Sequence, residues 1–218
     1  MEPCKIKICG LSRFSDIIAV NEIIPDYIGF VFAESSRRVT ADKARQLKGV
    51  LDQRIQTVGV FVNSPIEEIL SLTYQNHGRE PVIHMIQLHG DEDASYIMRL
   101  KNHTDLPVIK AVRVRDTEQI RMAQELPCEY LLLDTCAKGV YGGAGVGFDW
   151  NLIPKLTKPF FLAGGISSGN LEQAARFRPY CIDVSSGAET EGRKDRAKIA
   201  DLVNRLRKIN EYNECKGA

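Results

Sequence analysis

The feature that most limits the fold of this chain is a series of eight short apolar runs rich in β-branched and aromatic residues. Taken together, the runs are nearly continuous in Val, Ile, Leu and Phe rather than alternating with polar residues, which is typical of parallel strands covered on both faces. The eight predicted strands are Lys5–Cys9, Tyr27–Phe32, Thr57–Val62, Met85–His89, Val108–Val114, Tyr130–Asp134, Phe160–Ala163 and Cys181–Ser185.

Segments with helical spacing of apolar residues lie between these runs. Several follow good capping residues: Ser15-Asp16 before IIAVNEII, Thr40 before ADKARQL, and Asn63-Ser64-Pro65 before IEEILSLTY. The strand starts are about 21 to 30 residues apart, the length of a repeated strand–loop–helix–loop unit. Eight such units joined by right-handed crossovers predict an α/β fold, a single-domain (β/α)8 TIM barrel over residues 1–218.

An open, doubly wound sheet is the alternative arrangement of such units. It usually has about five to seven strands and a glycine-rich dinucleotide fingerprint directly after the first. Here eight runs are present and the first ends in Ile8-Cys9-Gly10-Leu11, which lacks that fingerprint. The barrel is therefore favoured.

Composition narrows the classes of partner. With 44% apolar and 26% charged residues and a net charge of +1, the chain has material for one core but no excess of basic residues, so nucleic acid is not an expected partner. No run approaches the roughly 18 apolar residues of a membrane span, and the six cysteines lack zinc or redox spacing. We expect a cytoplasmic protein with free thiols, no metal and no membrane partner, either a monomer or a homodimer.

Barrel active sites lie at the carboxyl ends of the strands, so reactive side chains at these points are candidates. Cys9 ends the first run. A free cysteine is most often a small buried hydrophobe, but a thiol in this position can act as a base if a nearby positive charge or a helix terminus stabilises the thiolate. Both interpretations stay open for Cys9 at this point.

Asp134 ends the sixth run, directly after three leucines. It can be read as an ordinary strand-ending or loop-capping carboxylate. However, the next segment, 135–147 (TCAKGVYGGAGVG), contains five glycines and matches neither a P-loop nor a dinucleotide fingerprint. A flexible loop of this kind can close over a substrate and exclude water, so Asp134 is a candidate proton donor.

The last two runs lead into Ala163-Gly164-Gly165-Ile166-Ser167 and Asp183-Val184-Ser185-Ser186-Gly187. Loops after strands 7 and 8 of a barrel often bind phosphate, because glycine lets backbone N–H groups approach an anion closely. The alternative is that Gly-Gly only turns the chain into a helix near Ser168. The shared small, hydroxyl-bearing composition of the two loops favours phosphate.

Further polar residues follow the second and fourth runs. Arg37 and Arg38 are either a solvated pair or, at a barrel mouth, a means of binding a carboxylate through two parallel hydrogen bonds. In the fourth run Gln87 and His89 reach the carboxyl end, whereas His84 precedes the run and is expected to be structural. These histidines and their neighbours do not support a metal site.

Seven motifs in order, spanning almost the whole chain, resemble phosphoribosylanthranilate isomerases: KICG, GFVFAESSRRVT, VGVFVN, IQLHGDE, LLLDT followed by GGAGVGFDW, LAGGI, and IDVSSGAE. IQLHGDE and DVSSGAE are the most specific of these motifs, and VGVFVN is the least. The resemblance implies an Amadori rearrangement of N-(5-phosphoribosyl)anthranilate in tryptophan biosynthesis, without a cofactor.

The same resemblance implies roles for individual residues. Asp134 is the general acid that opens the ribose ring, and Cys9 is the general base that removes the C2′ proton. Arg37 binds the anthranilate carboxylate, with Arg38 as the nearest competitor. The remaining expected contacts with substrate are Gln87, His89 and Asp183, and the expected phosphate contacts are Gly164, Gly165, Ser186 and Gly187.

Rival functions share parts of this pattern. Other phosphate-binding barrels, such as indole-glycerol-phosphate synthase, a histidine-pathway isomerase or thiamine phosphate synthase, would have similar final loops. The combination of Cys9 with Asp134 discriminates, because the indole synthase is expected to use a lysine and glutamates and the histidine-pathway isomerase two aspartates. A non-catalytic phosphosugar sensor would bind ligand without turnover. The additional Cys136, two residues after Asp134, has no assigned role.

Overall fold

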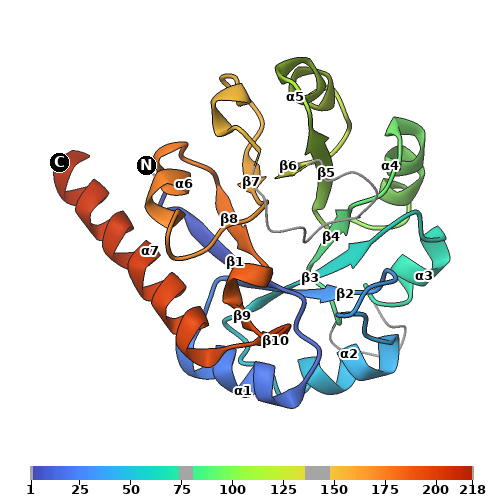
Figure 1. The fold of residues 1–218 in the computed structure, drawn as a ribbon. Coiled ribbons are helices and arrows are strands. Elements are labelled where there is room, and N and C mark those ends of the chain that lie inside the picture. Colours follow the sequence, from blue (N-terminus) through green and yellow to red (C-terminus); the bar gives the residue numbers. More distant parts are fainter. Residues whose placement is uncertain (1, 74–80, 136–147, 218) are drawn as a thin grey trace.

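Eight parallel strands form a closed barrel in the computed structural model, which describes residues 2–73, 81–135 and 148–217 (Figure 1). Every predicted strand is confirmed to within one residue at either end. The strands are β1 (Lys5–Cys9), β2 (Tyr27–Val31), β3 (Gln56–Phe61), β4 (Met85–Leu88), β5 (Val108–Val114), β6 (Tyr130–Thr135), β7 (Phe160–Leu162) and β8 (Cys181–Val184). β1 pairs with β8 and closes the barrel, with Lys7 opposite Asp183.

Helices cover the outside of the barrel (Figure 1). They are α1 (Phe14–Ile23), α2 (Ala41–Lys48), α3 (Ile66–Leu70), α4 (Ala94–Lys101), α5 (Thr117–Ala123), α6 (Leu171–Arg176) and α7 (Arg196–Gly217). The prediction that a helix follows every strand is wrong at one point: the described residues between β6 and β7 contain only the short 3-10 helix η1 (Trp150–Leu152). A second 3-10 helix, η2 (Ser186–Ala188), and the strand pair β9 (Glu189–Thr190) and β10 (Arg193–Lys194) follow β8.

The helix starts follow from local capping chemistry. Thr40 caps α2 as predicted, since its side chain accepts a hydrogen bond from the Lys43 backbone N–H at 3.2 Å. α3 begins at Ile66, directly after the predicted proline. α1 begins at Phe14, so Ser15 and Asp16, predicted to cap a helix that starts at Ile17, lie inside its first turn; the Asp16 side chain accepts N–H groups from the residues ahead of the helix.

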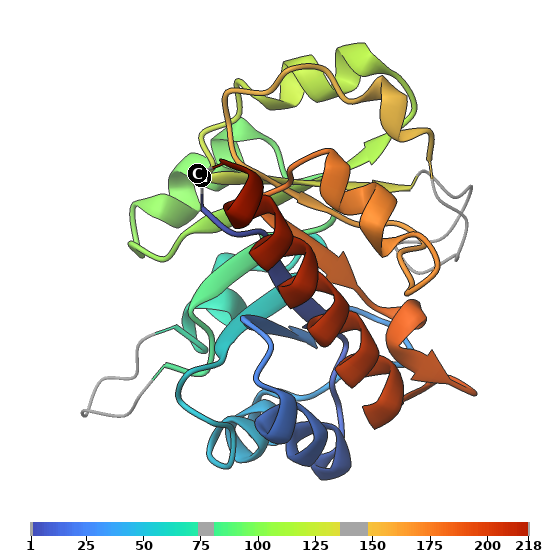
Figure 2. The same ribbon diagram turned by 90° about the vertical axis from the view of Figure 1, so that its left-hand side faces the viewer.

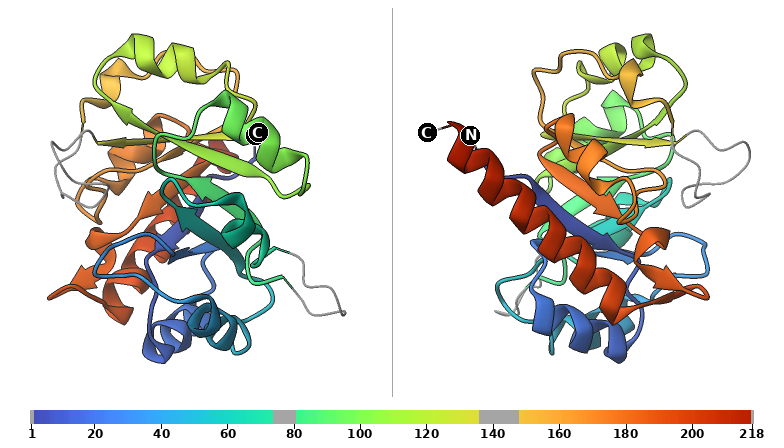
Figure 3. Two further views of the ribbon diagram at one scale, coloured as in Figure 1. Left: turned by 90° about the vertical axis from the view of Figure 1, so that its right-hand side faces the viewer. Right: turned by 60° about the vertical axis from the view of Figure 1, so that its left-hand side comes forward.

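The last helix, α7, closes the outer layer beside the first. It packs against α1 and α6 (Figure 2) and runs diagonally across the outside of the barrel (Figure 3). Its Asn210 side chain binds both polar backbone groups of Cys4, accepting from the N–H at 3.1 Å and donating to the carbonyl at 2.8 Å. This ties the two ends of the chain together. No helix in the described ranges is both long and apolar enough to span a membrane.

The interior of the barrel is filled at its amino end by aromatic rings. The fully buried ring of Phe161 lies 5.9 Å from Tyr27, 5.6 Å from Tyr130 and 5.6 Å from Tyr180, between ring centroids. The hydroxyl groups of Tyr27 and Tyr180 are 2.7 Å apart and share a hydrogen bond. This aromatic packing fills the barrel interior at the amino ends of the strands.

Removing the Phe161 ring should destabilise the protein. Phe161→Ala leaves a cavity among three tyrosines, and truncation of a buried phenylalanine typically lowers the free energy of unfolding by about 3 to 5 kcal/mol. Urea titration followed by circular dichroism measures the change. Met122→Ala, at a side chain that is 67% exposed, is the control and should stay within about 0.5 kcal/mol. Equal stability of the two variants would contradict this account of the core.

Candidate active site

The structure places the two predicted catalytic side chains on the same rim of the barrel. Cys9 is the last residue of β1 and Asp134 lies near the end of β6, and all eight strands run in one direction. Both are mostly buried, with 8% and 6% of their surfaces exposed. Neither is therefore an ordinary solvated side chain.

A path of polar contacts crosses the barrel towards Asp134. The ammonium of Lys7 donates to Gln87 Oε1 at 2.7 Å, and the Gln87 Nε2 atom lies 2.8 Å from His89 Nδ1. An ammonium can only donate, so the Gln87 amide nitrogen must face His89 and Nδ1 must accept. A neutral His89 consequently carries its proton on Nε2, which lies 3.2 Å from Asp134 Oδ2.

The contact between His89 and Asp134 is close but poorly aligned. Although the two atoms are within ion-pair distance, their geometry falls outside that of a hydrogen bond, and His89 Nε2 has no hydrogen-bond partner among the described residues. The Asp134 carboxylate is oriented instead by the next backbone N–H, because its Oδ1 accepts a hydrogen bond from Thr135 N at 2.7 Å. Oδ2 is thus the oxygen shared with His89.

Sequence reasoning missed Lys7, although a signal was present. The side chain is fully buried, and its ammonium binds Asp183 Oδ2 at 3.0 Å in addition to Gln87. Residues two apart in a strand point to the same face, so the lysine two residues before Cys9 in the run KIKIC has to point into the barrel on the same side as Cys9. The alternation within the first strand was enough to identify it.

The surroundings of Cys9 act on its thiol in opposite directions. Burial raises the pKa of Cys9 above its ordinary value, and the negative charge of Asp183 adds to this, whereas the positive charges of Lys7 and Lys194 lower the pKa. The net pKa is raised. The resting group in the free protein is therefore mainly the thiol, with two cations placed to stabilise its anion.

Arg37 is held in a defined orientation by a residue that sequence reasoning did not select. Its Nε and one terminal nitrogen donate to the two carboxylate oxygens of Glu189, each at 2.7 Å. Burial raises the pKa of Glu189, but the hydrogen bonds from Arg37 and Lys194 lower it by more, so that the net pKa falls to about 2. The Arg37 stem crosses the end of β1, where a Cβ on Gly10 would lie 2.4 Å from Arg37 Cδ.

Arg38, the competitor of Arg37, is differently placed. It pairs with Glu34, and both side chains are largely exposed. The Arg37 side chain lies against Gly10, the residue after Cys9, and is only 22% exposed. The residue that holds Arg37 in place, Glu189, belongs to the β9–β10 hairpin, more than 150 positions further along the chain.

The two final loops pack against each other and against the catalytic candidates. Gly164 and Gly165 have positive φ angles of 87° and 67°, which other residues rarely adopt. A Cβ on Gly164 would lie 3.2 Å from Asp134 Oδ1, and one on Gly187 would lie 1.9 Å from the Ile166 carbonyl oxygen. Ser186 begins η2 at the same rim. The predicted phosphate loops therefore adjoin the acid candidate.

The two carboxylate oxygens of Asp183 differ in their hydrogen bonding. Oδ2 accepts from Lys7, while the buried Oδ1 has no hydrogen-bond partner within the described ranges. His84 binds the backbone and hydroxyl of Thr57 ahead of β4, as a structural histidine would. Cys136 and the glycine-rich segment through 147 lie outside the described residues, and no cluster suited to a metal ion occurs among the residues described.

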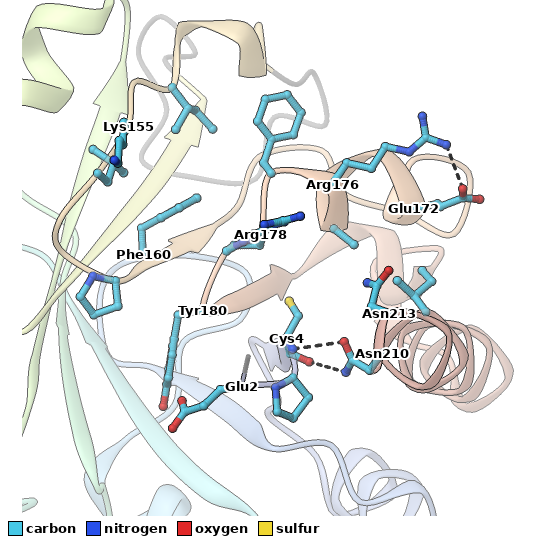
Figure 4. A pocket seen from close by; sticks show the side chains of 18 of the residues that line it. Glu2, Cys4, Lys155, Phe160, Glu172, Arg176, Arg178, Tyr180, Asn210 and Asn213 are labelled. Atoms are coloured by element: carbon cyan, nitrogen blue, oxygen red, sulfur yellow. Dashed lines mark hydrogen bonds and ion pairs between the residues drawn. The ribbon is translucent and has the colours of Figure 1, made fainter. Parts of the chain in front are cut away.

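A separate groove of about 1750 Å³ lies at the opposite end of the barrel (Figure 4). It is lined by the segments preceding β1, β7 and β8 and by the end of α7, with Tyr180 and Asn210 among its residues. None of the predicted site residues lines it. The groove is therefore not the candidate active site.

Comparison with known proteins adds independent findings. Residues 6–205 match the family model described as N-(5'-phosphoribosyl)anthranilate isomerase. A relative of that name from Endomicrobium trichonymphae is 45% identical over 206 residues, which cover 94% of this chain and 99% of the relative.

Solved structures are similar over the same extent. A phosphoribosyl anthranilate isomerase from Thermus thermophilus has a TM-score of 0.79 at 30% identity, covering 94% of this chain and 99% of its own. A second isomerase, in complex with reduced 1-(o-carboxyphenylamino)-1-deoxyribulose 5-phosphate, has a TM-score of 0.74 at 28% identity with the same coverage.

Proposed function

The chain belongs to the N-(5'-phosphoribosyl)anthranilate isomerase family and carries out that isomerisation in tryptophan biosynthesis, and we propose that Asp134 is its general acid and Cys9 its general base. The reaction converts an aminoaldose into the corresponding aminoketose. It is an internal redistribution of hydrogen, so the residues must supply and accept protons at defined atoms of the substrate.

Two proton transfers make up the proposed reaction. Protonated Asp134 donates to the ribose ring oxygen, the C1′–O bond breaks, and the nitrogen lone pair forms a C1′=N Schiff base. The Cys9 thiolate then removes the C2′ proton, the electron pair of that C–H bond forms the C1′=C2′ bond of an enolamine, and the π pair of the C1′=N bond returns to the nitrogen. The enolamine gains a proton at C1′ and loses its hydroxyl proton, which yields the ketone without net proton uptake.

The observation that carries this proposal is the placement of a buried thiol and a buried carboxyl group on one rim, on strands β1 and β6. An acid and a base must reach different atoms of one bound sugar, so they should come from separated strands of the same rim. The final glycine loops adjoin Asp134, which supports binding of the phosphoryl end of the substrate there through Gly164, Gly165, Ser186 and Gly187.

The remaining contacts orient the substrate. Arg37 keeps one terminal nitrogen outside its pair with Glu189, which supports its role in binding the anthranilate carboxylate. Asp183 Oδ1 has no hydrogen-bond partner among the described residues, which supports acceptance of a hydrogen bond from a ribose hydroxyl. Gln87 and His89 line the same rim, and we assign His89 a contact close to the atom that Asp134 protonates.

Turnover of the substrate tests the proposal. The purified chain should consume N-(5-phosphoribosyl)anthranilate, observed as loss of anthranilate-type fluorescence, and carbon-13 NMR of the product should show a ketone carbonyl carbon in place of the anomeric carbon of the substrate. A non-catalytic sensor would bind the same compound and change its fluorescence once, in proportion to protein rather than with time. Stoichiometric change without turnover would therefore contradict the proposal.

Arg37→Lys should raise KM by roughly 10-fold or more with a smaller effect on kcat. A lysine keeps the charge but loses the planar fork, and hydrogen bonds to charged groups contribute about 1.5 to 3 kcal/mol. The matched control is Arg38→Lys, whose neighbour Glu34 and exposed side chain place it away from the site. A raised KM in the Arg38 variant, with Arg37→Lys unaffected, would exchange the two roles.

Two further sequence-based predictions concern the location and assembly of the chain. They are the cytoplasmic location and the state of the chain as a monomer or a homodimer. Fractionation of the source cells addresses the first, and light scattering of the purified protein addresses the second.

A further inference from the structure

We propose that Lys7 is a positioning residue that supplies the positive charge stabilising the Cys9 thiolate, opposed by the carboxylate of Asp183. The inference deepens the proposed function, on which its catalytic consequence rests. It concerns a buried charge to which neither the motifs nor the proton transfers above assign a role.

The backbone places the ammonium and the thiol together. Lys7 and Cys9 are two residues apart on β1, so both side chains point into the barrel. Gly29 of β2 is the register partner of Cys9, and a Cβ built there would lie 2.7 Å from Cys9 Sγ and 3.2 Å from Lys7 Cε. The missing side chain of Gly29 leaves the space in which the sulfur and the lysine stem meet.

Lys7 remains charged despite complete burial. Burial lowers the pKa of Lys7, but the negative charge of Asp183, its hydrogen bond to the ammonium and the interaction with Cys9 together raise the pKa by more, so that the net pKa is raised. A charge interacts several-fold more strongly through the protein interior than through water. The ammonium therefore acts strongly on its nearest ionisable neighbours.

The other charged groups that face Cys9 are largely committed elsewhere. They are Asp183 on β8, Lys194 on β10, and Arg37 in the loop after β2. Arg37 and Lys194 share the carboxylate of Glu189, which offsets their charge. Lys7 has Asp183 as its ion-pair partner, and that partner raises the pKa of Cys9 while Lys7 lowers it. The charge balance at the thiol is thus set mainly by this pair.

The test measures the Cys9 thiol without substrate. Alkylation of the protein by iodoacetamide is followed against pH, and mass spectrometry quantifies the peptide that contains Cys9, so the other cysteines do not interfere. Only the thiolate reacts, and one pKa unit is a tenfold change in its fraction below the pKa. Lys7→Met should shift the profile upwards by about one unit or more, so alkylation at neutral pH falls roughly tenfold. Lys7→Arg should stay close to the wild type.

A second variant covers the case in which Lys7→Met does not fold, because that change leaves Asp183 buried without its cation. Asp183→Asn keeps Lys7 and its amide partner Gln87 but removes the opposing charge, so the profile should move to lower pH. The double variant Lys7→Met with Asp183→Asn should lie between the two single variants. An unchanged or upward-shifted profile in Asp183→Asn, or an unchanged profile in folded Lys7→Met, would overturn the inference.

A kinetic measurement separates this role from a merely structural one. The kcat of Lys7→Met should recover as pH rises, because a higher pH restores the thiolate that the missing charge no longer stabilises. A loss of kcat that is the same at every pH contradicts the proposal. A wild-type protein without turnover would instead contradict the roles of Cys9 and Asp134, and the alkylation profiles would still report on Lys7.

Discussion

Cys9→Ala should lower kcat by roughly 10²- to 10⁴-fold, the usual contribution of a positioned general base. Alanine cannot accept the C2′ proton, while the Arg37 and phosphate contacts remain, so binding of the reduced product analogue should change little. The assay is the loss of substrate fluorescence, with affinity measured separately by calorimetry. Because Cys9 is small and packs against Gly29, we expect a loss of stability of only about 1 kcal/mol.

Cys128→Ala is the matched control for this experiment. Cys128 is also buried, with 6% of its surface exposed, but it precedes β6 and so lies at the opposite end of the barrel. Its kcat should equal that of the wild type. If Cys9→Ala keeps a kcat within threefold of the Cys128 variant, the thiol is not the base.

Asp134→Asn should reduce kcat by a similar factor, roughly 10²- to 10⁴-fold, because an amide has nearly the shape of the carboxyl group but cannot give up a proton to the ring oxygen. The Thr135 N–H can still donate to the side-chain oxygen, so the local backbone should be retained. Ring opening should become the slow step. Substrate that already carries an open chain, such as the ketose product in the reverse direction, should still bind.

The control for Asp134→Asn is Asp42→Asn, on the exposed face of α2. Its carboxylate pairs with Arg45 on the surface, and pairs of this kind contribute little to stability. Wild-type kcat is expected. An Asp134→Asn enzyme as active as this control would remove the carboxyl group from the mechanism.

Several elements of the site could be predicted because they are local in the chain. The ends of apolar runs mark the strand ends to within one residue, and in a parallel barrel all such ends share one rim, so Cys9 and Asp134 could be placed together. The doubled glycine after β7 is likewise readable, since its positive φ angles exclude most other residues. The start of α1 was predicted at Ile17, three residues too late, because the Asp16 side chain accepts N–H groups from residues ahead of the helix while lying inside its first turn.

The charge environment of the site is not local. Lys7 meets Gln87 and Asp183 from strands 80 and 176 positions away, and Arg37 meets Glu189 at a separation of 152. No periodic pattern in the chain encodes such pairs. The choice between Arg37 and Arg38 is of the same kind, because adjacent residues differ only in which side of the loop they face.

The number, order and spacing of the apolar runs favoured an eight-stranded barrel, with a thiol and a carboxyl group at the carboxyl ends of its strands, since the burial of a strand is written in its own run of residues. Only the tertiary structure decided which charges act on that thiol and which arginine faces it. The energy between two charges depends on their distance through the folded interior, and closure of β1 against β8 sets that distance.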